Sequence, residues 1–122
     1  MGTIKVIVIT GASDGIGAAA ARSLAQAGHQ VVLVGRSPDK TNRVAAELEA
    51  DSHVADFADL GAVRALAATL RANYPRIDVL ANNAGGVSSA RSRQVTGDGH
   101  ERAFQVNYLA PFLLTRDRKS VV

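Results

Sequence analysis

The chain of 122 residues is 47% hydrophobic and 20% charged, a balance that predicts a globular domain and excludes a disordered segment. It contains no cysteine, which excludes a disulfide framework and a cysteine-based metal site and suits a reducing cytoplasm. The net charge is +3, but the basic residues form no stripe with interleaved aromatics, so nucleic-acid binding is not expected. We expect a cytoplasmic protein without membrane attachment, because no apolar run is long enough to span a bilayer and no signal-peptide pattern opens the chain.

The N-terminal part of the chain predicts a strand, a glycine-rich loop and a helix in direct succession. Residues 4–9 are apolar apart from Lys5, which is typical of a strand buried on both faces. A helix is predicted over residues 15–27, ended by Gly28. The strand and the helix are joined by a loop with three glycines: Thr10-Gly11-Ala12-Ser13-Asp14-Gly15-Ile16-Gly17. Unpaired N–H groups and the helix dipole attract an anion at such a helix start, so this order indicates a phosphate-binding turn.

The glycine spacing bears on the kind of nucleotide. G-x-x-x-G-x-G differs from the more familiar G-x-G-x-x-G, and the loop lacks the Lys-Ser/Thr pair that a mononucleotide P-loop requires. Each glycine removes a Cβ that would block the turn, the approach of a pyrophosphate, or helix–strand packing. A structural turn without a ligand is the alternative interpretation.

The rest of the chain predicts further strands and helices in alternation. Strands are predicted over residues 31–34, 53–55 and 77–81. Helices are predicted from Pro38, capped by Ser37, to about residue 50, from the cap Asp59 to Pro75, and from Asp98 onward. Alternation of this kind gives βαβ units, and right-handed crossovers then give the strand order 3-2-1-4. The predicted fold class is therefore α/β: an incomplete, Rossmann-type doubly wound parallel sheet with helices on both faces.

Gly35-Arg36 follows the second predicted strand, at the point that lies over the adenosine ribose in a doubly wound fold. An acidic residue there would accept a hydrogen bond from the 2′-hydroxyl, whereas a guanidinium binds a 2′-phosphate through two charge-assisted hydrogen bonds. The pair therefore predicts NADP in preference to NAD, and a solvated loop arginine is the alternative. At the end of the third strand, Asp56 is suited to accept from an adenine amino group while the Phe57 backbone addresses the ring nitrogens. Alternatively, Asp56 only starts the turn before Asp59.

Three asparagines complete the candidate site. Asn82 and Asn83 follow the fourth strand, where their short amides can tie neighbouring loops together. Asn107 lies in the last predicted helix, four residues before Pro111. Because Pro111 has no N–H, the Asn107 carbonyl is left free to hold a water or a ligand. A proline kink used only for packing is the alternative.

In their order and spacing, these motifs resemble the short-chain dehydrogenase/reductase family over about residues 3–115. The resemblance implies an NAD(P)-dependent oxidoreductase that transfers hydride to or from a small-molecule alcohol or carbonyl, with Asn107 as the catalytic asparagine. Gly35-Arg36 resembles the NADP-preferring branch, and residues 96–115 resemble the retinol-dehydrogenase-like group. The family often pairs through its last helix present here, which leaves a homo-oligomeric parent open. The cofactor-binding residues implied are Gly11, Ser13, Asp14, Gly15, Ile16, Gly17, Arg36, Asp56, Phe57, Asn83, Ala84 and Gly85.

The sequence departs from this family in its acid/base group. Members use a tyrosine with a lysine four residues later, but Tyr74 and Tyr108 are followed at that spacing by Asp78 and Phe112. Without an acid/base at the carbonyl oxygen, hydride transfer has no partner proton. We therefore expect an N-terminal fragment that is inactive as written. A non-catalytic dinucleotide-binding sensor is the alternative function.

The end of the chain carries no helix or strand pattern. Residues 1–115 are expected to form a truncated NADP-binding domain, and residues 116–122 a tail that does not look native. The codons that would spell residues 117–122 match a common sequencing adapter, so we expect that segment not to be biological. A gene that continues in frame beyond Thr115 with a Tyr-x-x-x-Lys motif would favour the enzyme over the sensor.

Overall fold

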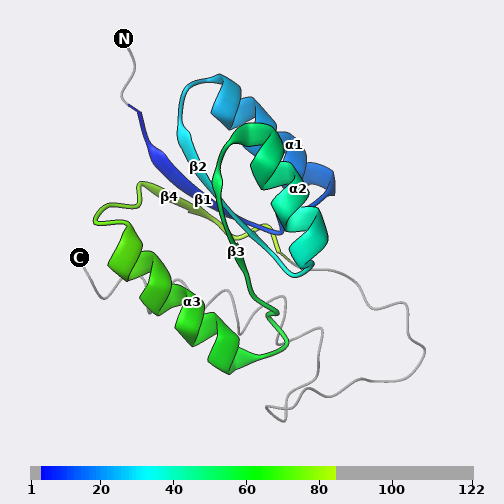
Figure 1. The fold of residues 1–122 in the computed structure, drawn as a ribbon. Helices are drawn as coiled ribbons and strands as arrows, with labels where there is room; N and C mark the ends of the chain where they lie inside the picture. The colour runs from blue at the N-terminus through cyan, green and yellow to red at the C-terminus, as the bar shows by residue number, and fades with distance from the viewer. Residues whose placement is uncertain (1–3, 85–122) are drawn as a thin grey trace. The chain divides into compact units, whose positions relative to one another are not determined.

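The computed structural model describes residues 4–84 of the chain (Figure 1). These residues belong to two compact units, each described here by itself. Residues 4–54 and 76–83 lie in the first unit, and residues 55–75 and Ala84 lie in the second. Among residues 4–84, no helix combines the length and the apolar character that a membrane crossing requires.

The first unit contains a parallel sheet of four strands. They are β1 (Val6–Thr10), β2 (Gln30–Gly35), β3 (Asp51–Val54) and β4 (Val79–Ala81). Their order is β3-β2-β1-β4, which confirms the predicted 3-2-1-4 topology. In the register, Val8 pairs with both Val32 and Leu80. The carboxyl ends of the strands therefore lie at one edge of the sheet, where a doubly wound fold binds its ligands.

Helices α1 (Gly15–Gln26) and α2 (Pro38–Leu48) cover one face of this sheet (Figure 1). Strand side chains that point toward them, such as Ile9 and Leu33, are at most 1% exposed. Val8 and Val32 point to the opposite face and are fully buried as well. Burial on both faces explains why the strands are apolar without alternation. The core between α1, α2 and the sheet contains Ile7, Ile9, Ala12, Ala18, Ala21, Val31, Leu33, Val44 and Ala45.

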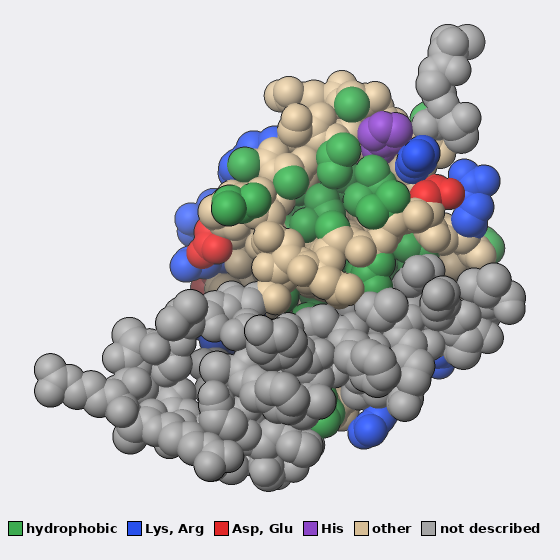
Figure 2. Space-filling view, turned by 180° about the vertical axis from the view of Figure 1, so that it is seen from behind, with side chains coloured by type: hydrophobic (Ala, Val, Ile, Leu, Met, Phe, Trp, Pro, Cys, Tyr) green, Lys and Arg blue, Asp and Glu red, His purple; other side chains and the backbone are tan. Residues whose placement is uncertain are grey.

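Charged and apolar side chains are segregated at the surface. Figure 2 shows hydrophobic side chains gathered in the middle of one face of the described residues, with charged side chains toward the margins. Two large apolar side chains are strongly exposed, Ile4 at 64% and Ile16 at 81%. Ile4 precedes the sheet, whereas Ile16 stands in the first turn of α1 beside the glycine-rich loop.

The second unit contains α3 (Leu60–Asn73). The Asp59 carboxylate caps it by accepting a hydrogen bond from the Ala62 N–H at 3.3 Å, as the sequence predicts. Tyr74 ends the helix with an extended backbone, directly before Pro75. Four apolar residues at helical spacing are at most 5% exposed: Val63, Leu66, Ala67 and Leu70.

Several predicted element bounds were wrong by one or two residues. Strand β1 begins at Val6 and not at residue 4, β3 spans Asp51–Val54 in place of 53–55, and β4 begins at Val79 in place of residue 77. Helix α2 ends at Leu48 because Glu49 adopts a left-handed backbone with φ of 52°. The predicted helix from Asp98 lies outside the described residues.

Candidate nucleotide-binding site

The glycine-rich loop turns sharply between β1 and α1. Gly11 and Gly15 have positive φ angles of 67° and 59°, a left-handed conformation that favours glycine. Gly17 serves a different purpose, since an added Cβ would overlap the Gly11 carbonyl oxygen and lie 2.6 Å from Asn83 Nδ2. The loop is thus folded back onto the first turn of α1, with no room for a side chain between them.

Hydrogen bonds fix this loop to the ends of β2 and β4. The Ala12 N–H donates to the Val34 carbonyl at 3.1 Å. The buried Thr10 hydroxyl donates to the Ala81 carbonyl at 3.3 Å and accepts from the Asn83 N–H at 3.0 Å. Asn83 Nδ2 in turn donates to the Gly11 carbonyl at 3.4 Å. The predicted tie between loops is confirmed for Asn83.

The first turn of α1 contains no acidic residue. Asp14 occupies the N-cap position with an extended backbone, but its carboxylate makes no capping hydrogen bond. The carboxylate lies 3.3 Å from Lys40 Nζ, and no acidic residue stands in the first helical turn. The positive end of the helix dipole is therefore not matched by a carboxylate on the first turn, which suits an anionic ligand. Ser13 precedes this turn and is partly exposed.

The end of β2 is packed closely against α2. Gly35 is buried, and an added Cβ would overlap Thr41 Oγ1 and lie 3.2 Å from Ser13 Cβ. The next residue, Arg36, is exposed, and Ser37 then caps α2 by accepting from the Lys40 N–H at 3.4 Å. Arg36 is thereby held at the carboxyl edge of the sheet, beside the N-terminus of α2.

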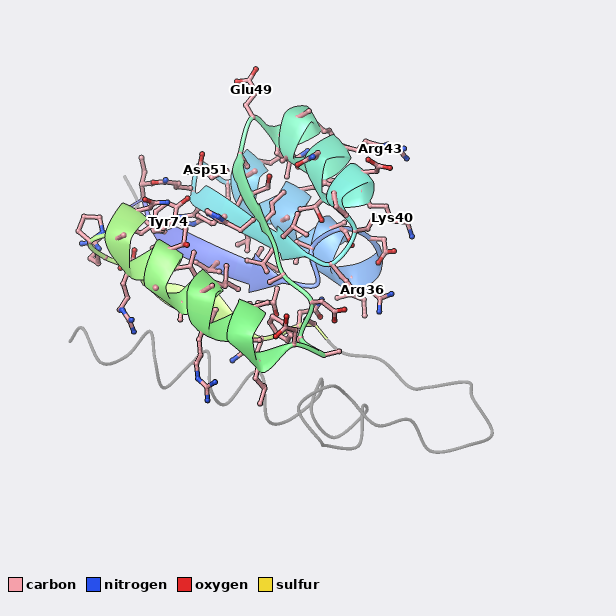
Figure 3. The ribbon with its side chains drawn as sticks, turned by 60° about the horizontal axis from the view of Figure 1, so that its bottom comes forward. Arg36, Lys40, Arg43, Glu49, Asp51 and Tyr74 are labelled. Atoms are coloured by element: carbon pink, nitrogen blue, oxygen red, sulfur yellow. The ribbon has the colours of Figure 1, made fainter. Side chains whose placement is uncertain are left out.

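Basic side chains follow one another along one side of α2. Figure 3 shows Arg36, Lys40 and Arg43 in this succession, starting at the end of β2. Lys40 and Arg43 are three residues apart within α2 and share one helical face, whereas Arg36 precedes the helix. Of these three residues, only Arg36 was predicted from the sequence as a site residue. The basic character of Lys40, four residues after Arg36, is the sequence feature that could have identified it.

A second ion pair joins α1 to α2. Arg22 Nε lies 2.7 Å from Glu47 Oε2, and Arg22 Nη2 lies 3.2 Å from Glu47 Oε1, so the contact is bidentate. The hydrogen bond to Glu47 raises the pKa of Arg22, and the hydrogen bond from Arg22 lowers the pKa of Glu47. The two helices are thus linked by charges at two places, through Asp14–Lys40 and through Arg22–Glu47.

The remaining candidate residues lie in the second unit or beyond the described part. Asp56 Oδ1 accepts from the Ala58 N–H at 2.9 Å, and the Asp56 carbonyl accepts from the Asp59 N–H at 3.0 Å. Asp56 therefore does form the turn before Asp59, and Phe57 beside it is 5% exposed. Ala84 belongs to the same unit. Gly85 and Asn107 lie outside the described residues.

Metal binding has no support in the described part of the chain. Within residues 4–84, no three histidine or carboxylate side chains come together in a way that could hold a metal ion.

The parallel sheet, its strand order and the glycine-rich loop at the first strand–helix junction define a dinucleotide-binding α/β domain. The family model described as short chain dehydrogenase matches residues 5–118, and this chain belongs to that family. Its members are oxidoreductases that bind NAD(P) and act on small-molecule alcohols or carbonyls. The expected resemblance is confirmed.

The curated relatives include a bacterial protein and a mammalian protein. The chain is 52% identical over 118 residues to "Putative daunorubicin C-13 ketoreductase DnrU" of Streptomyces sp. (strain C5), covering 92% of this chain and 40% of that protein. It is 39% identical over 118 residues to retinol dehydrogenase 12 of Mus musculus, covering 91% of this chain and 37% of that protein. The chain thus spans about two-fifths of the length of these curated relatives.

Solved structures share the fold over most of the chain. A short-chain dehydrogenase from Sphingobium yanoikuyae in complex with NADPH is 34% identical with a TM-score of 0.80, covering 94% of this chain and 47% of that one. A metagenomic short-chain oxidoreductase in complex with NADP is 37% identical with a TM-score of 0.81, covering 96% of this chain and 56% of that one.

Proposed function

We propose that this chain binds NADP and is the cofactor-binding part of a short-chain oxidoreductase acting on an alcohol or a carbonyl compound. The observation that carries the proposal is the pairing of a tightly closed glycine loop with Arg36 at the next strand end. Similar proteins bound to NADPH and NADP support the choice of cofactor. When bound, the nicotinamide would supply or accept the hydride.

In this proposal, each part of the cofactor meets a particular feature of the chain. The pyrophosphate lies against the N–H groups at the start of α1, beside Ser13, Asp14 and Ile16, where the glycines leave room for its approach. Arg36 binds the 2′-phosphate through two charge-assisted hydrogen bonds. Asp56 and the Phe57 backbone address the adenine. Asn83, Ala84 and Gly85, which come after β4 in the sequence, are assigned to the remainder of the cofactor.

Beyond cofactor binding, the proposal assigns one catalytic residue to the chain. Asn107 is assigned as the catalytic asparagine whose carbonyl orders a water in the proton relay. The 122 residues contain no Tyr-x-x-x-Lys motif, so a proton donor for the carbonyl oxygen is missing from this stretch. We therefore expect the isolated chain to bind nucleotide without turnover.

A dinucleotide sensor without chemistry is the second candidate function. The two candidates predict different gene sequences. A genomic reading frame that continues beyond Thr115 into a Tyr-x-x-x-Lys motif supports the enzyme, whereas a genomic stop codon there supports the sensor. Amplification of the source gene across this junction makes the distinction.

Titration of NADPH and NADH into the chain, followed by nicotinamide fluorescence, tests the cofactor assignment. NADPH is expected to bind more tightly, on the order of ten- to a hundredfold, because the Arg36 guanidinium is charged and bidentate. Arg36→Ala should remove most of this difference. Arg22→Ala is the matched control, because it deletes the same charge from α1 at a site paired with Glu47. Equal affinities in the unmodified chain would refute the assignment.

A further inference from the structure

The two ion pairs between α1 and α2 differ in strength and position. Arg22–Glu47 is bidentate, with a shortest contact of 2.7 Å. Asp14–Lys40 is a single contact of 3.3 Å, and its side chains are 70% and 58% exposed. It lies at the N-terminal end of α1, beside the glycine-rich loop. An exposed single contact of this kind is easily exchanged for another partner.

Asp14 is unusual for a helix N-cap. Aspartate is a favoured residue at this position because its carboxylate accepts from the N–H groups of the first turn, where the helix dipole also favours a negative charge. Here the carboxylate makes no capping hydrogen bond and contacts Lys40 in its place. The same contact leaves the start of α1 available to an anion and occupies the Lys40 ammonium.

Lys40 stands at the same end of α2 as Arg36. Its backbone N–H donates to the cap residue Ser37, so Lys40 belongs to the first turn of α2 and follows Arg36 by four residues. Figure 3 shows both side chains on one side of this helix. Arg36 and Lys40 together carry two positive charges, and the Asp14 carboxylate offsets the charge of Lys40. A phosphate monoester carries close to two negative charges at neutral pH.

We propose that Asp14 is an internal counter-ion that competes with the 2′-phosphate of the cofactor for Lys40, and so limits the preference for 2′-phosphorylated nucleotides. Lys40 is then the second cation of the phosphate site beside Arg36. In the nucleotide-free chain it pairs with Asp14, and when the ligand binds it transfers to the phosphate. This inference rests on the proposed NADP-binding function and adds a specificity-determining pair to it.

The test compares two ligands that differ only in the 2′-phosphate. Calorimetric titration of 2′,5′-ADP and of 5′-AMP into the full chain gives two dissociation constants, whose ratio measures the contribution of the 2′-phosphate. Asp14→Asn should increase the preference for 2′,5′-ADP about two- to fivefold at low salt, the range typical of an exposed ion pair. Lys40→Gln should reduce the preference, and Asp14→Asn should add nothing in the Lys40→Gln background.

Glu47→Gln is the matched control, since it removes one carboxylate and one ion pair from the same two helices at the other contact. Its ratio should equal that of the unmodified chain. A second variant, Asp14→Ser, keeps a neutral capping side chain and guards against loss of the helix start; it should raise the ratio as Asp14→Asn does.

Two results would overturn the inference. A lower preference for 2′,5′-ADP in Asp14→Asn would mean that Asp14 positions Lys40 for the phosphate. A higher preference that persists when Asp14→Asn is combined with Lys40→Gln would mean that the Asp14 charge acts on the phosphate directly and not through Lys40. Failure of the underlying function looks different. In that case the unmodified chain shows no preference for 2′,5′-ADP, and Arg36→Ala changes nothing.

Discussion

Replacement of Gly35 by alanine should be among the most damaging additions of a single methyl group to this chain. The new Cβ would overlap the Thr41 hydroxyl oxygen and lie 3.3 Å from Thr41 Cβ. Thr41 is fully buried on α2, and its N–H donates to the Ser37 carbonyl at 3.0 Å, so its backbone is held in place. Relief therefore requires that the buried Thr41 side chain rotate or that β2 and α2 move apart.

The magnitude follows from two opposing terms. Overpacking of a well-filled interior costs about 1–3 kcal/mol. Alanine in place of glycine restricts the unfolded chain and returns about 0.5–1 kcal/mol. The expected net loss in the free energy of unfolding for Gly35→Ala is therefore about 0–2.5 kcal/mol, centred near 1 kcal/mol.

Thr41→Ala should largely cancel that loss. The substitution removes the atom that Gly35→Ala would strike, and the Thr41 hydroxyl is buried without a hydrogen-bond partner, so little is lost with it. Urea unfolding followed by circular dichroism of both single variants and the double variant measures the coupling, expected at about 1 kcal/mol or more. Gly61→Ala is the control, because its Cβ would meet only Asp59 Oδ1, at 3.2 Å. Additive effects of the two substitutions would refute the steric reasoning.

Two further predictions concern polar contacts. Thr10→Val should lower the free energy of unfolding by about 1–2 kcal/mol in urea titrations, because it removes a buried hydroxyl with two hydrogen bonds while keeping the shape of the side chain. Thr10→Ser keeps the hydroxyl and is the control. A loss of stability in Thr10→Val no larger than that in Thr10→Ser would contradict this reasoning. Because Arg22 lowers the pKa of Glu47 below its usual 4.5, the stabilisation by this pair should be complete above about that pH and be lost as pH falls through the lowered pKa. The difference in melting temperature between the unmodified chain and Glu47→Gln should accordingly be smaller at pH 3 than at pH 7. An equal difference at the two pH values would contradict the stabilisation by this ion pair.

The topology was predictable because it depends on local patterns and chirality. Apolar runs that alternate with amphipathic stretches predict βαβ units, and the right-handed crossover leaves one strand order for a ligand site after the first strand. Capping is equally local, and Ser37 and Asp59 make the predicted hydrogen bonds. The end of α2 was not predictable in this way, because Glu49 takes the left-handed position that glycine usually signals.

The candidate site was predictable only as far as its contacts are close in sequence. The loop and Arg36 follow from residues that adjoin strand ends. The contact between Asp14 and Lys40 joins residues 26 positions apart, and the Thr10–Asn83 bond joins residues 73 apart. Such pairs exist only once the parallel strands bring their carboxyl ends together. Composition and spacing identify Asn83 as a residue that ties loops together, but they do not identify its partners Thr10 and Gly11 or the pairing of Asp14 with Lys40.

The two kinds of contact at this edge of the sheet imply two kinds of mutant. Thr10, Gly17 and Gly35 are buried; an added Cβ at either glycine would overlap neighbouring atoms, and loss of the Thr10 hydroxyl would break its hydrogen bond with Asn83. Changes at these residues should therefore alter stability and nucleotide binding together. Asp14 and Lys40 are exposed and joined by one exchangeable contact, so changes there should alter the choice between nucleotides while leaving stability nearly constant. Under the proposed NADP-binding function, cofactor preference can therefore change by surface substitution alone, without a rearrangement of the buried contacts at this edge of the sheet.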